Sequence, residues 1–179
     1  MSYKIDPRIE LRGRLDSLNA EIICVQSYSD DEGFIADLEE LREVVRTLQR
    51  CEAANESFTA RLTLWGLDED EIHSQSHNPS EWAYNSATSS ASCQGGEGHE
   101  MARGSSQKGK HIMPHYSMGA KAAEINRLRT LVRECELSAC RVFMNDSLRI
   151  NHVLNRLSSA LYILIYKYTP SEYDKYINF

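Results

Sequence analysis

Apolar residues recur every three or four positions over long stretches of this chain, which is the spacing that places side chains along one face of an α-helix. Residues 6–26 carry such a stripe, formed by Leu11, Leu15, Leu18, Ile22 and Val25. The dipeptide Asp6-Pro7 suits an N-cap followed by the first helical residue. A second stripe follows over residues 34–54, formed by Phe34, Leu38, Leu41, Val45 and Leu48. The two stripes predict two amphipathic core helices.

Two further helices are predicted over residues 124–143 and 148–168, joined by residues 144–147. The first has an apolar stripe formed by Leu128, Val132, Cys135, Ala139 and Val142. The second contains the run 158–166, SSALYILIY, which is apolar on nearly all sides after its serines. In a soluble helix such a run indicates burial by several neighbouring elements or by another subunit.

Both of these helices carry polar residues next to their apolar stripes. Arg129, Arg133 and Glu136 are spaced i, i+4 and i+7, so they share one face of the first helix. The second helix has a polar stripe formed by Asn155, Ser158, Ser159 and Tyr162. Solvated surface charges would explain the first stripe taken alone. Because the second stripe runs into a buried helix, we favour a binding site or a subunit interface at the edge of a cleft.

The middle of the chain is less regular. A short helix is predicted over residues 60–72, interrupted at Gly66. His73 and His77 have the i, i+4 spacing of a metal-binding pair, but they lack an accompanying carboxylate-histidine motif, so a role in holding a loop is favoured. Residues 82–110 are rich in Ser and Gly and poor in apolar residues, and they cannot bury enough surface to offset the entropy of ordering. We expect a flexible or disordered loop there.

The composition favours an all-α fold. The chain has 179 residues, of which 41% are hydrophobic and 26% are charged, with only 4 prolines, 9 glycines and 8% aromatic residues. This length suits one domain, 1–179, with a sizeable core. The scarcity of proline and glycine favours helices over sheet. We therefore expect an antiparallel bundle of four to five helices, with an irregular connection over residues 74–115.

The charge and hydropathy exclude several classes of partner. A net charge of −6 argues against a general attraction to nucleic acid or to anionic membranes. No apolar run approaches the ~20 residues needed to span a bilayer, and the N-terminal residues lack the apolar core of a signal peptide. The expectation is a cytoplasmic protein that binds neither nucleic acid nor membrane.

The chain has five cysteines, and four of them lie within predicted helices without a CxxC spacing: Cys24, Cys51, Cys135 and Cys140. In a cytoplasmic protein this pattern favours small reduced core residues over disulfides or a metal site.

Several segments together resemble one family. Residues 128–137 (LRTLVRECEL) and 152–164 (HVLNRLSSALYIL) resemble the helix with arginines and glutamate, and the following Asn-Arg-Leu-Ser helix, of the ATP:cob(I)alamin adenosyltransferases. Residues 76–79 (SHNP) and 113–119 (MPHYSMG) resemble segments of the ethanolamine-utilisation branch of that family. With residues 11–22 (LRGRLDSLNAEI), the likeness covers most of the chain outside the Ser/Gly-rich segment.

The resemblance implies an activity and a set of roles. The 5′-deoxyadenosyl group of ATP would pass to cob(I)alamin, and Arg129 and Arg133 suit the charge of the triphosphate that leaves. Glu136 and Asn155 are expected to hold Mg²⁺, directly or through water, or the ribose hydroxyls. The family works as a homotrimer with sites between subunits. Asp16 matches the aspartate that forms an inter-subunit salt bridge to the arginine at the position of Arg129.

The resemblance also places a loop near the corrin ring of cobalamin. Soft apolar residues suit a flat macrocycle, and the matching residues are Met113, His115, Tyr116 and Met118. Full-length proteins of the ethanolamine-utilisation branch typically carry an additional N-terminal part with a cysteine-rich metal motif. This motif has no counterpart in the sequence, so a structural metal is not carried over from the resemblance.

Two departures from the family concern the nucleotide. The Thr-Gly-Asp loop of the wider family has no match, and Ser159 stands where an aspartate commonly follows Asn-Arg-Leu-Ser. Arg8, Arg12 and Arg14 are therefore further candidates for binding the ATP phosphates. The missing loop favours a second hypothesis, a non-catalytic helical oligomer that binds cobalamin or a partner protein. The joint retention of the arginines, glutamate and asparagine favours the transferase, in the cytoplasm or within a bacterial microcompartment.

The Ser/Gly-rich segment gives a first testable prediction. Deletion of residues 86–106 should leave folding intact, because a change in loop length costs little free energy and this segment has no core to lose. Thermal unfolding of the shortened chain measures the effect. A large drop in melting temperature would show that the segment packs against the domain.

Overall fold

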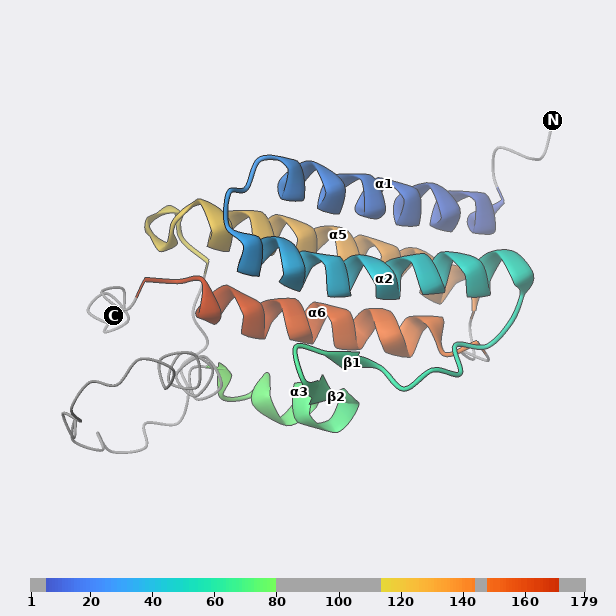
Figure 1. Ribbon diagram of the computed structural model, residues 1–179. Coiled ribbons are helices and arrows are strands. Elements are labelled where there is room, and N and C mark those ends of the chain that lie inside the picture. Colours follow the sequence, from blue (N-terminus) through green and yellow to red (C-terminus); the bar gives the residue numbers. More distant parts are fainter. Residues whose placement is uncertain (1–5, 80–113, 144–147, 171–179) are drawn as a thin grey trace.

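The computed structural model describes residues 6–79, 114–143 and 148–170, so the predicted loop at 82–110 lies outside the described residues. Four long helices lie side by side (Figure 1): α1 (Pro7–Ser27), α2 (Glu32–Ala54), α5 (Ala120–Val142) and α6 (Ile150–Lys167). Shorter elements lie between α2 and α5: β1 (Thr63–Leu64), β2 (Leu67–Asp68), α3 (Glu69–Gln75) and the 3-10 helix η2 (Tyr116–Met118). The prediction of an all-α helical bundle is confirmed.

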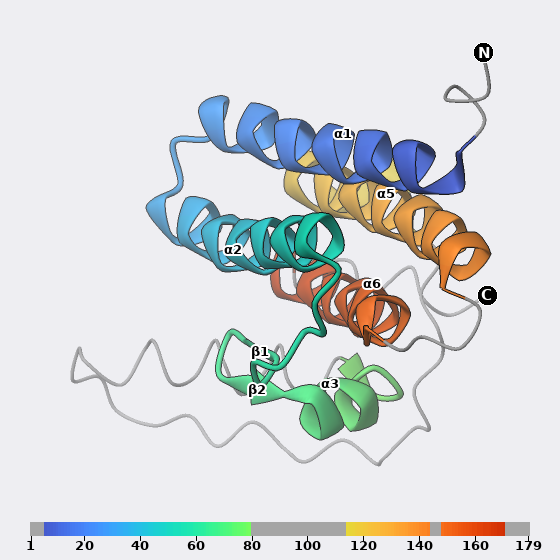
Figure 2. The ribbon, with the colours of Figure 1, turned by 90° about the vertical axis from the view of Figure 1, so that its right-hand side faces the viewer.

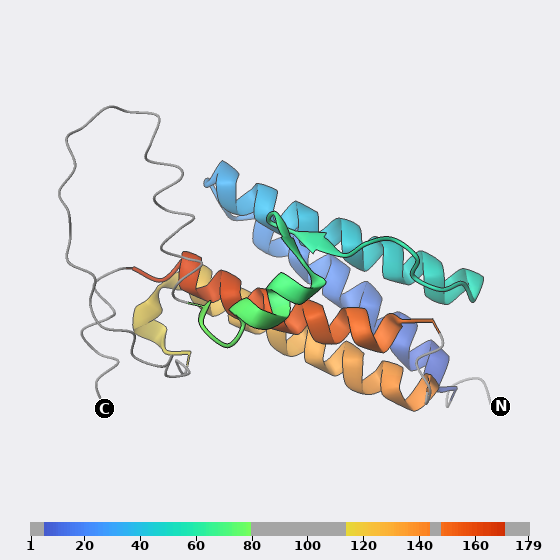
Figure 3. The same ribbon diagram turned by 90° about the horizontal axis from the view of Figure 1, so that it is seen from below.

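Neighbouring long helices run antiparallel. The view along the bundle shows α1 next to both α2 and α5, with α6 next to α2 and α5 on the other side (Figure 2). After α2 the chain turns back, and the hairpin of β1 and β2 leads into α3, which packs against α6 (Figures 1 and 3). This course places α5, α2 and α3 around α6.

The apolar run of α6 is buried by the chain itself. Nine of the apolar residues of α6 are at most 1% exposed: Ile150, Val153, Leu154, Leu157, Ala160, Leu161, Ile163, Leu164 and Ile165. The run therefore needs no second subunit to bury it, so its apolar character does not indicate an oligomer. Among the described helices, α6 included, none has the length and hydropathy of a membrane span.

The first two helices begin at capped residues. Asp6 accepts a hydrogen bond from the backbone N–H of Arg8 at 2.9 Å, as predicted for an N-cap. Asp31 accepts one from the backbone N–H of Phe34 at 3.1 Å. Helix α5 begins earlier than predicted, directly after Gly119. The φ of Gly119 is 91°, a conformation that glycine adopts readily, and it separates η2 from α5.

A β-hairpin replaces the first part of the helix predicted over residues 60–72. Strands β1 and β2 pair antiparallel, and the turn residues Trp65 and Gly66 have φ values of 53° and 79°. Positive φ at both positions suits a two-residue hairpin loop. The indole N–H of Trp65 donates to the backbone carbonyl of Asp37 in α2 at 3.0 Å. This contact with α2 cannot be read from local periodicity, and only the later part of the predicted helix forms, as α3.

The four described cysteines are free thiols. Cys135 is buried, and burial raises the pKa of its thiol to about 12. Cys51 is partly buried, whereas Cys24 and Cys140 are exposed. The prediction of core residues was therefore wrong for the last two, which lie outside the apolar stripes of α1 and α5.

A buried carboxylate joins α1 to the end of α2. Glu52 is 1% exposed, and its two oxygens accept hydrogen bonds from the Nε atoms of Arg8 and Arg12 at 2.9 and 2.6 Å. Arg8 also donates through Nη2 to the backbone carbonyl of Glu52 at 2.7 Å. Because a carboxylate removed from water needs such partners, the cluster fixes how α1 lies on α2.

Substitution of Glu52 tests this assignment. We expect Glu52→Ala to lower the free energy of unfolding by about 2 kcal/mol, less than for a fully buried pair, because Arg8 and Arg12 are partly exposed and regain water. The control Glu43→Ala removes an exposed partner of Arg46 and should cost less than about 0.5 kcal/mol. Urea denaturation measures both values. Equal losses in the two variants would contradict the assignment.

Candidate functional site

Most residues of the polar stripes of α5 and α6 line one cavity, with a volume of about 760 Å³. Helix α5 contributes Arg129 and Arg133, which lie four residues apart on one face. Helix α6 contributes Ser158, Ser159 and Tyr162, and the turn that follows α3 adds to the wall. The cavity thus lies at the seam between the two most tightly paired helices of the bundle.

Arg129 presents its guanidinium group over the ring of Tyr162. The guanidinium carbon lies 5.5 Å from the ring centroid, within the range of a cation–π interaction. One Nη atom donates to the side-chain oxygen of Asn126 at 3.4 Å, a long hydrogen bond. The Nε atom of Arg129 is buried, and no acceptor for it occurs among the described residues. The Nη atoms make no other hydrogen bond in the described chain, so they retain donors for a ligand or for another chain.

A chain of hydrogen bonds crosses the seam beside this arginine. Arg133 donates through Nη1 to one oxygen of Glu136 at 3.0 Å, and Asn155 donates through its side-chain nitrogen to the other oxygen at 3.0 Å. The Glu136 side chain is 15% exposed. Donors from both helices therefore fix a largely buried carboxylate at the edge of the cavity. The structure thus brings together Arg129, Arg133, Glu136 and Asn155, all of which the sequence singled out.

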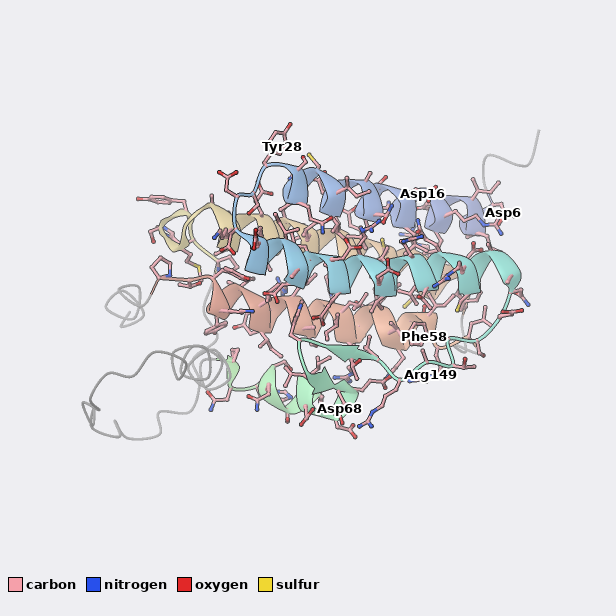
Figure 4. All side chains as sticks on the ribbon, viewed as in Figure 1. Asp6, Asp16, Tyr28, Phe58, Asp68 and Arg149 are labelled. Carbon is pink, nitrogen blue, oxygen red and sulfur yellow. The ribbon has the colours of Figure 1, made fainter. Side chains whose placement is uncertain are left out.

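Asp16 lies elsewhere on the chain. It is exposed on α1 (Figure 4), and its Oδ1 atom accepts a hydrogen bond from the side chain of Gln49 in α2 at 2.8 Å. Arg129 contacts α6 instead, and no hydrogen bond or ion pair joins it to Asp16 in the described chain. The predicted salt bridge runs between subunits, so it stays a prediction.

Arg8 and Arg12 are not brought to the cavity. Both bind Glu52, and the guanidinium of Arg8 lies 5.8 Å from the ring centroid of Phe143. Phe143 follows Arg129 by 14 positions, which is roughly 20 Å along a helix axis. The two groups of candidate arginines, Arg8 with Arg12 and Arg129 with Arg133, therefore lie at different positions along the bundle axis.

The residues expected near the corrin have different surroundings. Met113 lies outside the described residues, whereas His115 and Tyr116 are exposed, and Tyr116 is 85% exposed. Met118 is only 1% exposed and packs in the core, so of the predicted corrin-binding residues that the structure describes only His115 and Tyr116 are open to a ligand. Pro114 lines the cavity, which connects this loop to Arg129.

Sequence patterns missed other residues of the cavity wall. Asn126 precedes Arg129 by three positions on α5, and this i, i+3 spacing was the signal that could have identified it. Ser76 and His77 reach the cavity from the turn after α3. Their position depends on how α3 packs against α6, and no local pattern reports that contact.

The fold and the cavity define an all-α bundle protein with an arginine-bearing cleft at the seam of two antiparallel helices. The chain belongs to the cobalamin adenosyltransferase family, whose model matches residues 1–168. It is 32% identical over 170 residues to "Corrinoid adenosyltransferase EutT" of Salmonella typhimurium (strain LT2) and 29% identical over 172 residues to the protein of the same name from Escherichia coli (strain K12). Each match covers 92% of this chain and 54% of the relative, so the chain spans about half the length of these proteins.

Proposed function

We propose that this chain is a corrinoid adenosyltransferase that moves the 5′-deoxyadenosyl group of ATP to cob(I)alamin and so makes adenosylcobalamin. In this reaction the electron pair of Co(I) forms a bond to C5′ of ATP, the C5′–O bond breaks, and the triphosphate leaves with its electrons. Co(I) is itself a strong nucleophile, so the protein has to supply placement and charge compensation.

The observation that carries the proposal is the grouping of Arg129 and Arg133 in one cavity beside the Glu136–Asn155 pair. Guanidinium groups match the oxygens of a phosphate chain and stabilise negative charge that develops on a leaving group. The protein's own contacts leave part of this capacity free, because the Nη atoms of Arg129 make only the long hydrogen bond to Asn126 in the described part of the chain.

Mg²⁺ fits this proposal as a companion of ATP. Glu136 and Asn155 offer a carboxylate and an amide oxygen, and Mg²⁺ commonly binds through one or two protein oxygens while it keeps phosphate and water ligands. Within the described residues, no group of three His, Cys, Asp or Glu side chains could hold a metal without such a ligand. The ion would shield the charge of the phosphates, with Glu136 and Asn155 holding it directly or through water.

A homotrimer with sites between subunits is part of the same proposal. Asp16 is exposed on the outside of α1, where a neighbouring chain can reach it, and the Nη atoms of Arg129 make only one long hydrogen bond in the described chain. A salt bridge between Asp16 of one subunit and Arg129 of the next would satisfy both groups. The corrin would lie against His115 and Tyr116, and the setting would be the cytoplasm or an ethanolamine-utilisation microcompartment.

Spectroscopy tests the activity. The protein is incubated with ATP, Mg²⁺ and chemically reduced cobalamin, and the absorbance change that accompanies Co–C bond formation is followed. We expect stoichiometric conversion that requires ATP. Full corrinoid binding without a Co–C product would refute the transferase and support a cobalamin-binding oligomer.

Arg129→Ala tests the site. If Arg129 pairs with Asp16 and contacts the transferring group, we expect a loss of roughly 2 kcal/mol in transition-state stabilisation, which is about thirtyfold in rate. Asp16→Ala should weaken the same step, and the double mutant should be less than additive. Arg127→Ala is the matched control, because Arg127 is a half-exposed arginine of the same helix that pairs with Glu21 and Glu124.

These variants are compared in steady-state kinetics and in urea denaturation. The control should change the rate less than twofold, and it should lower the free energy of unfolding by about 1 kcal/mol because the largely buried Glu21 loses a partner. Full activity of Arg129→Ala would refute its assignment. Additive losses in the double mutant would keep both residues in the site but remove the salt bridge.

A further inference from the structure

Arg129 and Arg133 are held in different ways, although they lie one turn apart on the same helix. The N–H edge of Arg133 faces the Glu136 carboxylate at 3.0 Å. Arg129 has no carboxylate partner in the described chain, and its one hydrogen bond, to Asn126, is long at 3.4 Å. Its guanidinium instead lies over the face of the Tyr162 ring, 5.5 Å from the centroid.

A ring under the guanidinium plane has a different consequence from a carboxylate at its edge. A carboxylate neutralises the charge and occupies the N–H donors, whereas an aromatic face attracts the cation and leaves the donors at the edge available. Arg129 therefore keeps an unpaired positive charge and free Nη donors in the described chain, while the ring holds the guanidinium group in place. This is the arrangement that a group must have if it is to bind an incoming polyanion.

Tyr162 is itself held in place. Its hydroxyl lies 3.1 Å from the hydroxyl of Tyr166, one turn later on α6, and the two rings meet edge to face at a centroid distance of 5.5 Å. Both tyrosines are partly buried on a helix whose other faces are packed in the core. The ring under Arg129 thus belongs to the rigid part of the bundle.

We propose that Tyr162 is a positioning residue that orients Arg129 toward the triphosphate of ATP through a cation–π contact. The inference rests on the proposed function for the identity of the anion. Tyr162 acts through Arg129, and its hydroxyl is not needed for this role. The ring face is needed, so a lower electron density on the ring should weaken the hold on Arg129 and lower the affinity of the cavity for a polyphosphate.

A fluorination series at position 162 tests the proposal without removing the ring. Tyr162→Phe, which keeps the ring face, is the reference for the series, and its Kd for ATP is measured by calorimetry without cobalamin. Incorporation of mono-, di- and trifluorophenylalanine at position 162 reduces the negative charge of the ring face at nearly constant size. We expect the Kd to rise with each fluorine and to reach about tenfold for Tyr162→Leu. Tyr28→Leu, which removes an exposed tyrosine directly after α1, is the control and should leave the Kd unchanged.

A spectroscopic readout follows Arg129 itself. The Nε–H proton of Arg129, observed by NMR in arginine labelled with ¹⁵N, should show a ring-current shift in the wild type and in Tyr162→Phe, and the shift should be lost in Tyr162→Leu. The affinity for tripolyphosphate should fall in the same order of variants as the affinity for ATP, because Arg129 binds the phosphate chain that the two ligands share.

The outcomes separate the inference from the proposed function. ATP binding that weakens along the fluorine series, without any Co–C product, would refute the transferase and support the role of Tyr162. A Kd for ATP that stays constant along the fluorine series overturns the role of Tyr162 whatever the activity. So does a Tyr162→Leu variant whose Kd and Nε–H chemical shift equal those of the wild type. A wild-type protein that binds neither ATP nor tripolyphosphate overturns it as well.

Discussion

The packing of α5 against α6 is the constraint on which the candidate site depends. Along this seam Leu128 and Val132, from the apolar stripe of α5, are fully buried. The charged stripe lies next to it, so the close approach that buries the leucine and valine also brings Glu136 within 3.0 Å of Asn155. The geometry of the polar groups is therefore set by the apolar contact beneath them.

The burial of α6 explains why this seam can hold charged groups in a fixed arrangement. Helices α2, α3 and α5 surround α6. The apolar residues of α6 are almost completely removed from water. A helix fixed on these sides cannot shift easily relative to α5. Polar residues on its remaining face, such as Ser158 and Tyr162, then line a cavity whose wall is as rigid as the core.

Periodicity was sufficient to predict the four long helices, because each has an apolar stripe that one neighbouring surface can bury. It also identified the polar stripes with Arg129 and Asn155, since their i, i+3 and i+4 spacings are properties of a single helix. It failed where long-range contacts decide the structure. The Trp65 turn depends on α2, the burial of Met118 depends on the core beneath η2, and the contact of Arg129 with Tyr162 depends on the register of α5 against α6.

The structure also separates two sets of arginines that the sequence left as alternatives for the phosphates. Arg8 and Arg12 share the buried Glu52, which satisfies much of their charge, whereas Arg129 has a buried donor without an acceptor in the described residues. Electrostatic balance thus favours the seam of α5 and α6 over the start of α1 as the place for a polyanion.

The most direct test of this account is a crystal structure of the protein with ATP and Mg²⁺. We predict phosphate oxygens within about 3 Å of the guanidinium nitrogens of Arg129 and Arg133. A triphosphate bound at Arg8 and Arg12, with the cavity between α5 and α6 unchanged, would contradict the account.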